Sequence, residues 1–159
     1  MEKEQLQAYA ARVSQANRSE LVVIIMEAFL DSVADGKKYL QADQISEARR
    51  EIQRGKDFLT ELMGSLDLQY EISYYLRRLY IYSYRELCQG VALRDVERFD
   101  NATKVIGDLL PSFREVAKQD DSEPVMENAE PIYAGLTYGR TSLNESLGVN
   151  VNSNRGFQA

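Results

Sequence analysis

The first 118 residues contain few helix-breaking residues, and this feature constrains the fold more than any other. One proline and five glycines interrupt that stretch. Within it, apolar residues recur at intervals of three and four over four long segments, which is the spacing of a buried helix face. The breaks between the segments are short, and short connections favour antiparallel neighbours. The sequence therefore predicts an all-α fold, an antiparallel up-down four-helix bundle.

A short N-terminal leader helix is expected at residues 4–13, and the long helices are expected at residues 18–40, 44–63, 71–89 and 95–118. Asn17 and Glu20 have the spacing of a capping box at the start of the first long helix. Asp43 is expected to cap the second. Gly55 falls in the apolar seam of that helix, where it costs about 1 kcal/mol relative to alanine. We therefore expect another helix to approach closely at Gly55.

The predicted helix at residues 71–89 carries two apolar stripes on opposite sides, whereas a helix packed in one domain needs only one. The inner stripe consists of Ile72, Leu76, Leu79, Ser83, Leu87 and Gly90, and the outer stripe consists of Tyr74, Ile81, Tyr84 and Cys88. The inner stripe is expected in the core. The outer stripe stays exposed unless something covers it, and large exposed apolar patches mark interaction sites. A partner helix, a second copy of the chain or the chain's own tail could cover it.

The composition excludes several classes of function. The chain has no histidine, which removes the usual general base and the commonest metal ligand, so we expect no catalytic, metal or cofactor site. The net charge of −6 provides no basic surface for nucleic acid. No apolar run reaches the ~18 residues that a membrane span needs. The single cysteine, Cys88, suits a reducing compartment, and a cytoplasmic protein is expected.

The composition changes near residues 119–121, so we expect a bundle domain at residues 1–118 and an irregular C-terminal tail at residues 119–159. The tail has six acidic and two basic residues. Ser142 and Glu145 have capping-box spacing, and the tail holds more large apolar side chains than a disordered segment would. We expect residues 131–149 to fold back over an apolar face of the bundle as a placeholder for a partner. The docking side chains would be Ile132, Tyr133, Leu136, Tyr138, Leu143 and Leu147.

Three short motifs resemble one known family. Tyr9 in the leader precedes the capped start at Asn17, residues 61–67 read E-L-x-x-S-L-D, and residues 76–82 read L-x-x-L-Y-x-Y. In this order and spacing, the chain resembles the FliS family, the flagellin-specific export chaperones of bacterial flagella, over about residues 5–118. The chain departs from the family pattern at Asn17, where the family has a Ser-Pro start, and at Phe113, where it has a tryptophan.

The resemblance implies a cytoplasmic helical bundle that binds the C-terminal region of flagellin and prevents premature polymerisation. It also implies delivery of flagellin to a component of the flagellar type III export gate, with no catalysis and no cofactor. The expected client-binding residues are Tyr74, Ile81, Tyr84, Tyr80, Tyr82, Phe58 and Leu62. They would receive an apolar helix face.

Two other functions are weighed against this one. The alternative is a homodimeric helical adaptor that uses the same face on a second copy and has no flagellin client, so the chain is expected to be a monomer or a homodimer. An all-helical enzyme would need arginines and acids converging inside the bundle. The core stripes offer only Ser83 and Thr103, so an enzyme is not expected.

Overall fold

The computed structural model describes residue 1 and residues 3–125, and the structural statements below concern these residues. They form five helices and no strand: α1 (Lys3–Val13), α2 (Arg18–Gln41), α3 (Ile45–Gly64), α4 (Glu71–Leu93) and α5 (Val96–Gln119). The all-α fold is confirmed, with a leader helix followed by four longer ones. α5 ends at Gln119, close to the position where the composition changes.

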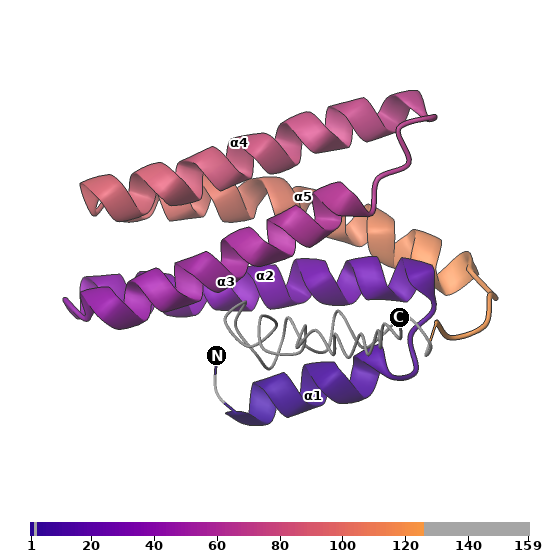
Figure 1. The fold of residues 1–159 in the computed structure, drawn as a ribbon, viewed down its shortest axis with the longest axis horizontal. Coiled ribbons are helices and arrows are strands. Elements are labelled where there is room, and N and C mark those ends of the chain that lie inside the picture. The colour runs from indigo at the N-terminus through magenta and orange to yellow at the C-terminus, as the bar shows by residue number, and fades with distance from the viewer. Residues whose placement is uncertain (2, 126–159) are drawn as a thin grey trace, which may run out of the picture.

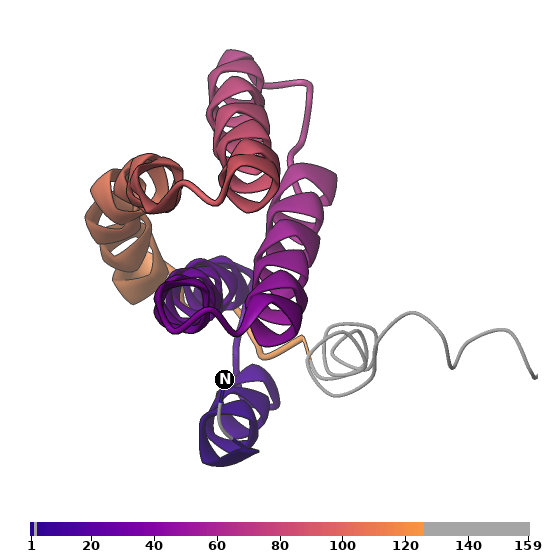
Figure 2. The same cartoon turned by 90° about the vertical axis from the view of Figure 1, so that its left-hand side faces the viewer.

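The four long helices surround a common core, and each packs against two others. α2 contacts α3 and α5, and α4 contacts the same two helices. Figure 2 shows this ring nearly end-on, with α1 outside it against α2. In Figure 1, α4 runs along one edge of the molecule and α1 along the opposite edge. The two edges of the bundle are therefore separate surfaces.

Helix α2 is the most buried element because α1, α3 and α5 all pack on it. Met26, Ala28 and Phe29, three residues within one turn, are completely buried. Its start carries the predicted capping box: the Asn17 side chain accepts from the Glu20 amide, and the Glu20 carboxylate accepts from the Asn17 amide, both at 2.9 Å. This prediction is confirmed, and it fixes where the leader ends and the bundle begins.

The predicted cap of α3 is wrong. Asp43 has a φ of 56°, in the left-handed region, and Gln44 precedes the first residue of the helix without a side-chain cap bond. The turn between α2 and α3 is tight, and its backbone closes on α2 itself, because the Gln44 amide donates to the Tyr39 carbonyl. The carboxylate of Asp43 instead lies 3.5 Å from Arg94, at the start of the α4–α5 turn.

Two glycines lie where helices approach each other closely. A Cβ on Gly55 would lie 3.1 Å from Val33 Cγ2, so the close approach expected at this position is confirmed. A Cβ on Gly90 of α4 would lie 2.7 Å from the Cδ1 atom of Phe99, a buried side chain of α5. The second contact fixes how near the C-terminal half of α4 lies to α5.

None of the helices among residues 3–125 is both long enough and apolar enough to cross a lipid bilayer.

We predict that Gly90→Ala destabilises the protein by about 1–3 kcal/mol, because the new methyl group overlaps the buried Phe99 ring. Gly107→Ala is the matched control, since nothing lies within 4 Å of a Cβ at that helical position. It should leave stability unchanged or raise it by up to about 1 kcal/mol through helix propensity. Urea unfolding of both variants measures the difference, and equal stabilities would contradict the close α4–α5 approach.

Candidate binding surface

Exposed apolar side chains are concentrated on one short stretch of the chain. Seven of the nine large hydrophobic residues exposed within the described part lie between positions 68 and 82. They are Leu68, Tyr70, Ile72, Tyr74, Tyr75, Leu79 and Tyr82. Scattered single apolar residues are ordinary on a protein surface, but a contiguous group indicates an interaction site.

Four of these residues form a regular row on α4, which we call the α4 seam: Ile72, Tyr75, Leu79 and Tyr82. Their exposed fractions are 61%, 53%, 37% and 45%. The spacing of three, four and three residues is that of the a and d positions of a heptad. An a/d row normally packs against another helix, yet none of the described helices covers this one. The α4 seam is the candidate binding surface.

The seam is open because α4 is attached to α5 only near its C-terminal half. Ser83 Oγ donates to the Ala102 carbonyl at 3.1 Å, and the buried Glu86 carboxylate accepts from Arg98 and Asn101, both at 3.1 Å. Residues 71–82 have no hydrogen bond to another helix among the described residues. In Figures 1 and 2, α5 starts beside α4 and ends beside α2. The N-terminal half of α4 therefore has one side without a neighbour.

Three of the predicted client-binding residues are wrong as surface residues. Tyr80, Phe58 and Leu62 have exposed fractions of 1%, 5% and 0% and belong to the core. Burial also raises the pKa of Tyr80 to about 12. Their apolar bodies fill space between α2, α3 and α4, so none of them can present a side chain to a partner.

The predicted inner stripe is confirmed toward the end of α4, where Ser83, Leu87 and Gly90 are buried, and wrong at two positions nearer its start. Ile72 and Leu79, expected in the core, are exposed, and Ser73 and Tyr80 are buried in their place. At these two positions the buried residue is the next one along the helix, and Leu76 between them packs against the core as predicted. The small residue Ser73 occupies a core position, and its low hydrophobicity hides that position in the sequence.

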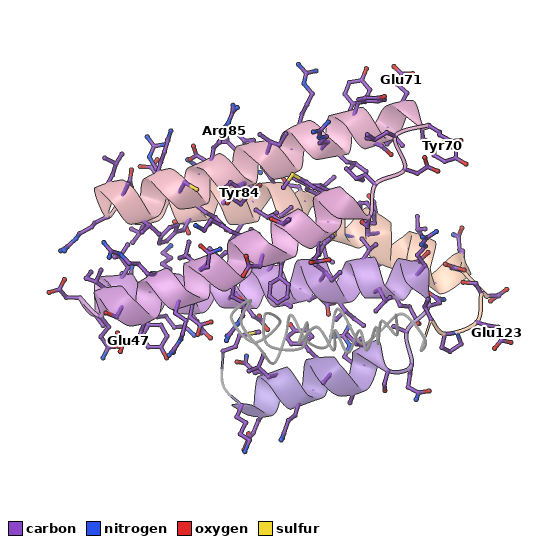
Figure 3. All side chains as sticks on the ribbon, in the orientation of Figure 1. Glu47, Tyr70, Glu71, Tyr84, Arg85 and Glu123 are labelled. Carbon is purple, nitrogen blue, oxygen red and sulfur yellow. The ribbon has the colours of Figure 1, made fainter. Side chains whose placement is uncertain are left out.

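The predicted outer stripe lies on the side of α4 nearer α3. Tyr74 is exposed, whereas Ile81 and Tyr84 are half-buried. Tyr84 packs against the core, with the Lys56 ammonium 5.8 Å from its ring centre, and Figure 3 shows it between α3 and α4. Of the predicted client-binding residues, only Tyr74 and Tyr82 are well exposed, and only Tyr82 lies in the seam.

A row of charged residues borders the seam on its solvent side. Glu71, Arg78 and Arg85 recur every seven residues beside Tyr75 and Tyr82. The Tyr75 hydroxyl donates to Glu71 at 3.3 Å. Arg78 and Arg85 are exposed and have no acidic partner within the described residues. Figure 3 shows Glu71 and Arg85 directed away from the bundle along the outer edge of α4. The seam therefore has an apolar centre and a mainly basic border.

A second concave surface lies on the other side of the molecule, beside α1. This hollow of about 470 Å³ has an apolar floor that includes Val23 and Ile24. The Glu27 carboxylate at its rim accepts from Arg12 at 2.6 Å and Arg114 at 2.8 Å. Burial raises the pKa of Glu27, but the two arginines outweigh this effect and the net shift is downward. These charges satisfy one another, so the hollow offers less to a charged partner than the seam does.

The start of the tail is attached to the joint between α1 and α2. The Asn17 amide group donates to the Asp120 carbonyl at 2.8 Å, and the Val125 amide donates to the Ala16 carbonyl at 3.0 Å. Hydrogen bonds from Ser122 and Ser19 lower the pKa of Asp120 to about 2. The residues predicted to dock the tail on the bundle, Ile132, Tyr133, Leu136, Tyr138, Leu143 and Leu147, lie outside the described residues.

Within residue 1 and residues 3–125, no cluster of three or more cysteine, aspartate or glutamate side chains could hold a metal ion. A family model described as "Flagellar protein FliS" matches residues 1–120. No individual curated protein matches the chain. The matched region contains all five helices and the whole α4 seam.

We predict that replacing either of two tyrosines, only two residues apart, has very different effects on stability. Tyr80→Ala should cost about 3–5 kcal/mol of unfolding free energy, because it empties a buried aromatic position. Tyr82→Ala should change stability by less than about 0.5 kcal/mol, because the ring is exposed. Chemical denaturation measures both values. A large loss from Tyr82→Ala would show that the seam is part of the core.

We also predict an acid-sensitive attachment of α1. Because the pKa of Glu27 is lowered in the folded chain, its ionised form stabilises the fold above the ordinary value of 4.5, and this contribution is lost as the pH falls. Glu27→Gln should therefore destabilise the protein at pH 7 and have less effect at pH 3. The control is Asp108→Asn, which removes an exposed pair with Lys104. Denaturation at both pH values should show no comparable difference for the control.

Proposed function

We propose, because the chain belongs to the FliS family of flagellar export chaperones, that it holds flagellin in the cytoplasm before export. In this proposal it binds the C-terminal helical region of flagellin and prevents premature polymerisation. It then delivers the client to a component of the flagellar type III export gate. The family is one of chaperones rather than enzymes, and the proposed activity makes and breaks no covalent bond.

The observation that carries the proposal is the exposed α4 seam. A helix-in-groove mode of recognition needs apolar anchors at helical spacing, and the seam supplies four such positions in just over ten residues. A client helix that covers them removes apolar surface from water at roughly 25 cal/mol per Å², less the cost of ordering the client. The seam replaces the outer stripe of Tyr74, Ile81 and Tyr84 as the proposed contact.

The proposed mechanism is mass action. Bound client is withdrawn from the pool that self-assembles, so polymerisation slows when the chaperone exceeds its dissociation constant. Binding of the client must also be reversible, because the export gate has to receive it. An interface centred on a few apolar anchors on one helix provides a moderate affinity of this kind.

For the tail, we propose that residues 131–149 fold back on the side of the bundle that carries α1. The support is the attachment of Val125 to Ala16, which starts the segment on the edge opposite α4. In this arrangement the tail leaves the α4 seam free for the client. A tail acting as a placeholder on the client surface would have to cross the bundle to reach it.

We predict that Tyr75→Ser combined with Leu79→Ser weakens binding of a flagellin C-terminal fragment by about tenfold or more, because two central anchors are lost. Isothermal titration of the full chain with the fragment from the flagellin of the same genome measures this. The matched control is Tyr74→Ser combined with Thr60→Ser, two exposed positions outside the seam. The control should bind as the native chain does.

Equal weakening by both double variants would argue against the seam as the client contact, and no binding by the native chain would argue against the flagellin client. A chain that ends at Val125 tests the tail in the same titration. Unchanged affinity agrees with a tail on the α1 side, whereas higher affinity would identify residues 126–159 as a competitor for the seam.

A further inference from the structure

The partner of the α4 seam is constrained by the charges along its border as well as by its apolar spacing. We infer that the seam binds an amphipathic helix whose apolar heptad positions are flanked by acidic side chains. The inference rests on the proposed function only where it identifies this helix with a segment of the client. The chemistry itself comes from α4.

The apolar row sets the shape of the occupant. From Ile72 to Tyr82 the seam covers three turns, about 15 Å. An a/d row is matched by a second helix that repeats its own apolar residues at the same interval, because side chains of each helix then fit between those of the other. An extended segment repeats every two residues and would direct half of its side chains away from the seam.

Polar contacts to the occupant are available on one flank only. On the other flank, Leu76 and Ser83 lie toward the core of the bundle. The open flank carries Glu71, Arg78 and Arg85 at intervals of seven residues. Arg78 and Arg85 have no acidic partner within the described residues, so acidic side chains from an incoming helix would complete two ion pairs there.

A second copy of the chain fits this border less well. In an antiparallel pair of copies centred on Arg78, each Glu71 would lie beside Arg85 of the other copy. The two Arg78 side chains, however, would meet at the symmetry axis. Like charges directly opposite each other are destabilising. A parallel pair would set each arginine row against the core-facing flank of the other copy. An acidic helix has neither problem.

The chain's own tail also fits poorly. The longest run between residues 126 and 159 that lacks proline and glycine is residues 140–147, and it contains a single acidic residue, Glu145. Eight residues are too few to cover the eleven positions of the seam as one uninterrupted helix. An acidic helix of three or more turns supplied by another protein is the occupant that matches both the spacing and the charge.

Two designed peptides test the inference on the full chain. Both have three heptads with leucine at the a and d positions, and their e and g positions are all glutamate in one and all lysine in the other. Like charges keep each peptide from pairing with itself. Because the chain has a net charge of −6, non-specific attraction would favour the lysine peptide. We expect the glutamate peptide to bind about tenfold more tightly at low salt.

The variant Arg78→Glu with Arg85→Glu should reverse this preference. Its matched control, Arg77→Glu with Arg49→Glu, makes the same change in net charge at two exposed arginines away from the border and should keep the native preference. Equal binding of the two peptides, or equal effects of the two double variants, would overturn the inference. These outcomes are independent of flagellin, so a failed flagellin titration with a clear peptide preference would refute only the client.

Hydroxyl-radical footprinting of the peptide-free chain, with its mass measured by light scattering, tests the other occupants. We expect Ile72 and Tyr75 to react in the free protein and to be protected by the glutamate peptide. Protection in a peptide-free dimer would identify a second copy in the seam. Protection in a peptide-free monomer would identify the tail. Either result would overturn the inference.

Discussion

The attachment of α4 to α5 along only one half of its length determines the candidate binding surface. Gly90 has no side chain and so leaves room for the Phe99 ring, and the Ser83 hydroxyl donates to the Ala102 carbonyl. These contacts keep the C-terminal half of α4 close to α5. α5 then runs toward α2, where Arg114 reaches Glu27. The N-terminal half of α4 keeps its inner contacts with the bundle through Tyr80 but loses its neighbour on one side. The α4 seam is the surface that this divergence uncovers.

The divergence of α4 and α5 also gives the two edges of the bundle different surfaces. The edge that carries α1 is held by polar contacts: the Tyr9 hydroxyl donates to Asp31 at 2.7 Å, and the α-amino group of Met1 lies 2.9 Å from the buried Glu51. Arg12 on this edge is likewise paired, with Glu27. The edge that carries α4 has exposed rings and unpaired arginines instead. On α4, exposed apolar side chains and unpaired arginines lie side by side, so the two kinds of evidence for a partner point to the same helix.

Much of the fold followed from the sequence because its signals are local. Helix positions depend on spacing and on scarce breakers, and the capping box at Asn17 and Glu20 depends on four adjacent residues. The buried residues in the N-terminal half of α4 could not be predicted in the same way. Both Ile72 and Tyr80 lie on acceptable helical stripes, and which one is buried depends on where α3 and α5 cross the helix. Ser73, which is buried beside Ile72, carries no hydrophobic signal at all. The sequence therefore predicted the helix itself but misassigned the faces of its N-terminal half.

The residue types in the seam suit a surface that must remain soluble while it is empty. Two of its four members are tyrosines, whose rings provide apolar area while their hydroxyls hydrogen-bond to water or, for Tyr75, to Glu71. The border arginines keep charge beside the rings and oppose self-pairing through Arg78. A row of leucines at the same positions would bind helices more indiscriminately and would favour association of the chain with itself. The combination of aromatic anchors with one-sided positive charge thus lowers the cost of exposure in the free protein and selects the partner by charge, and both effects come from the same three turns of α4.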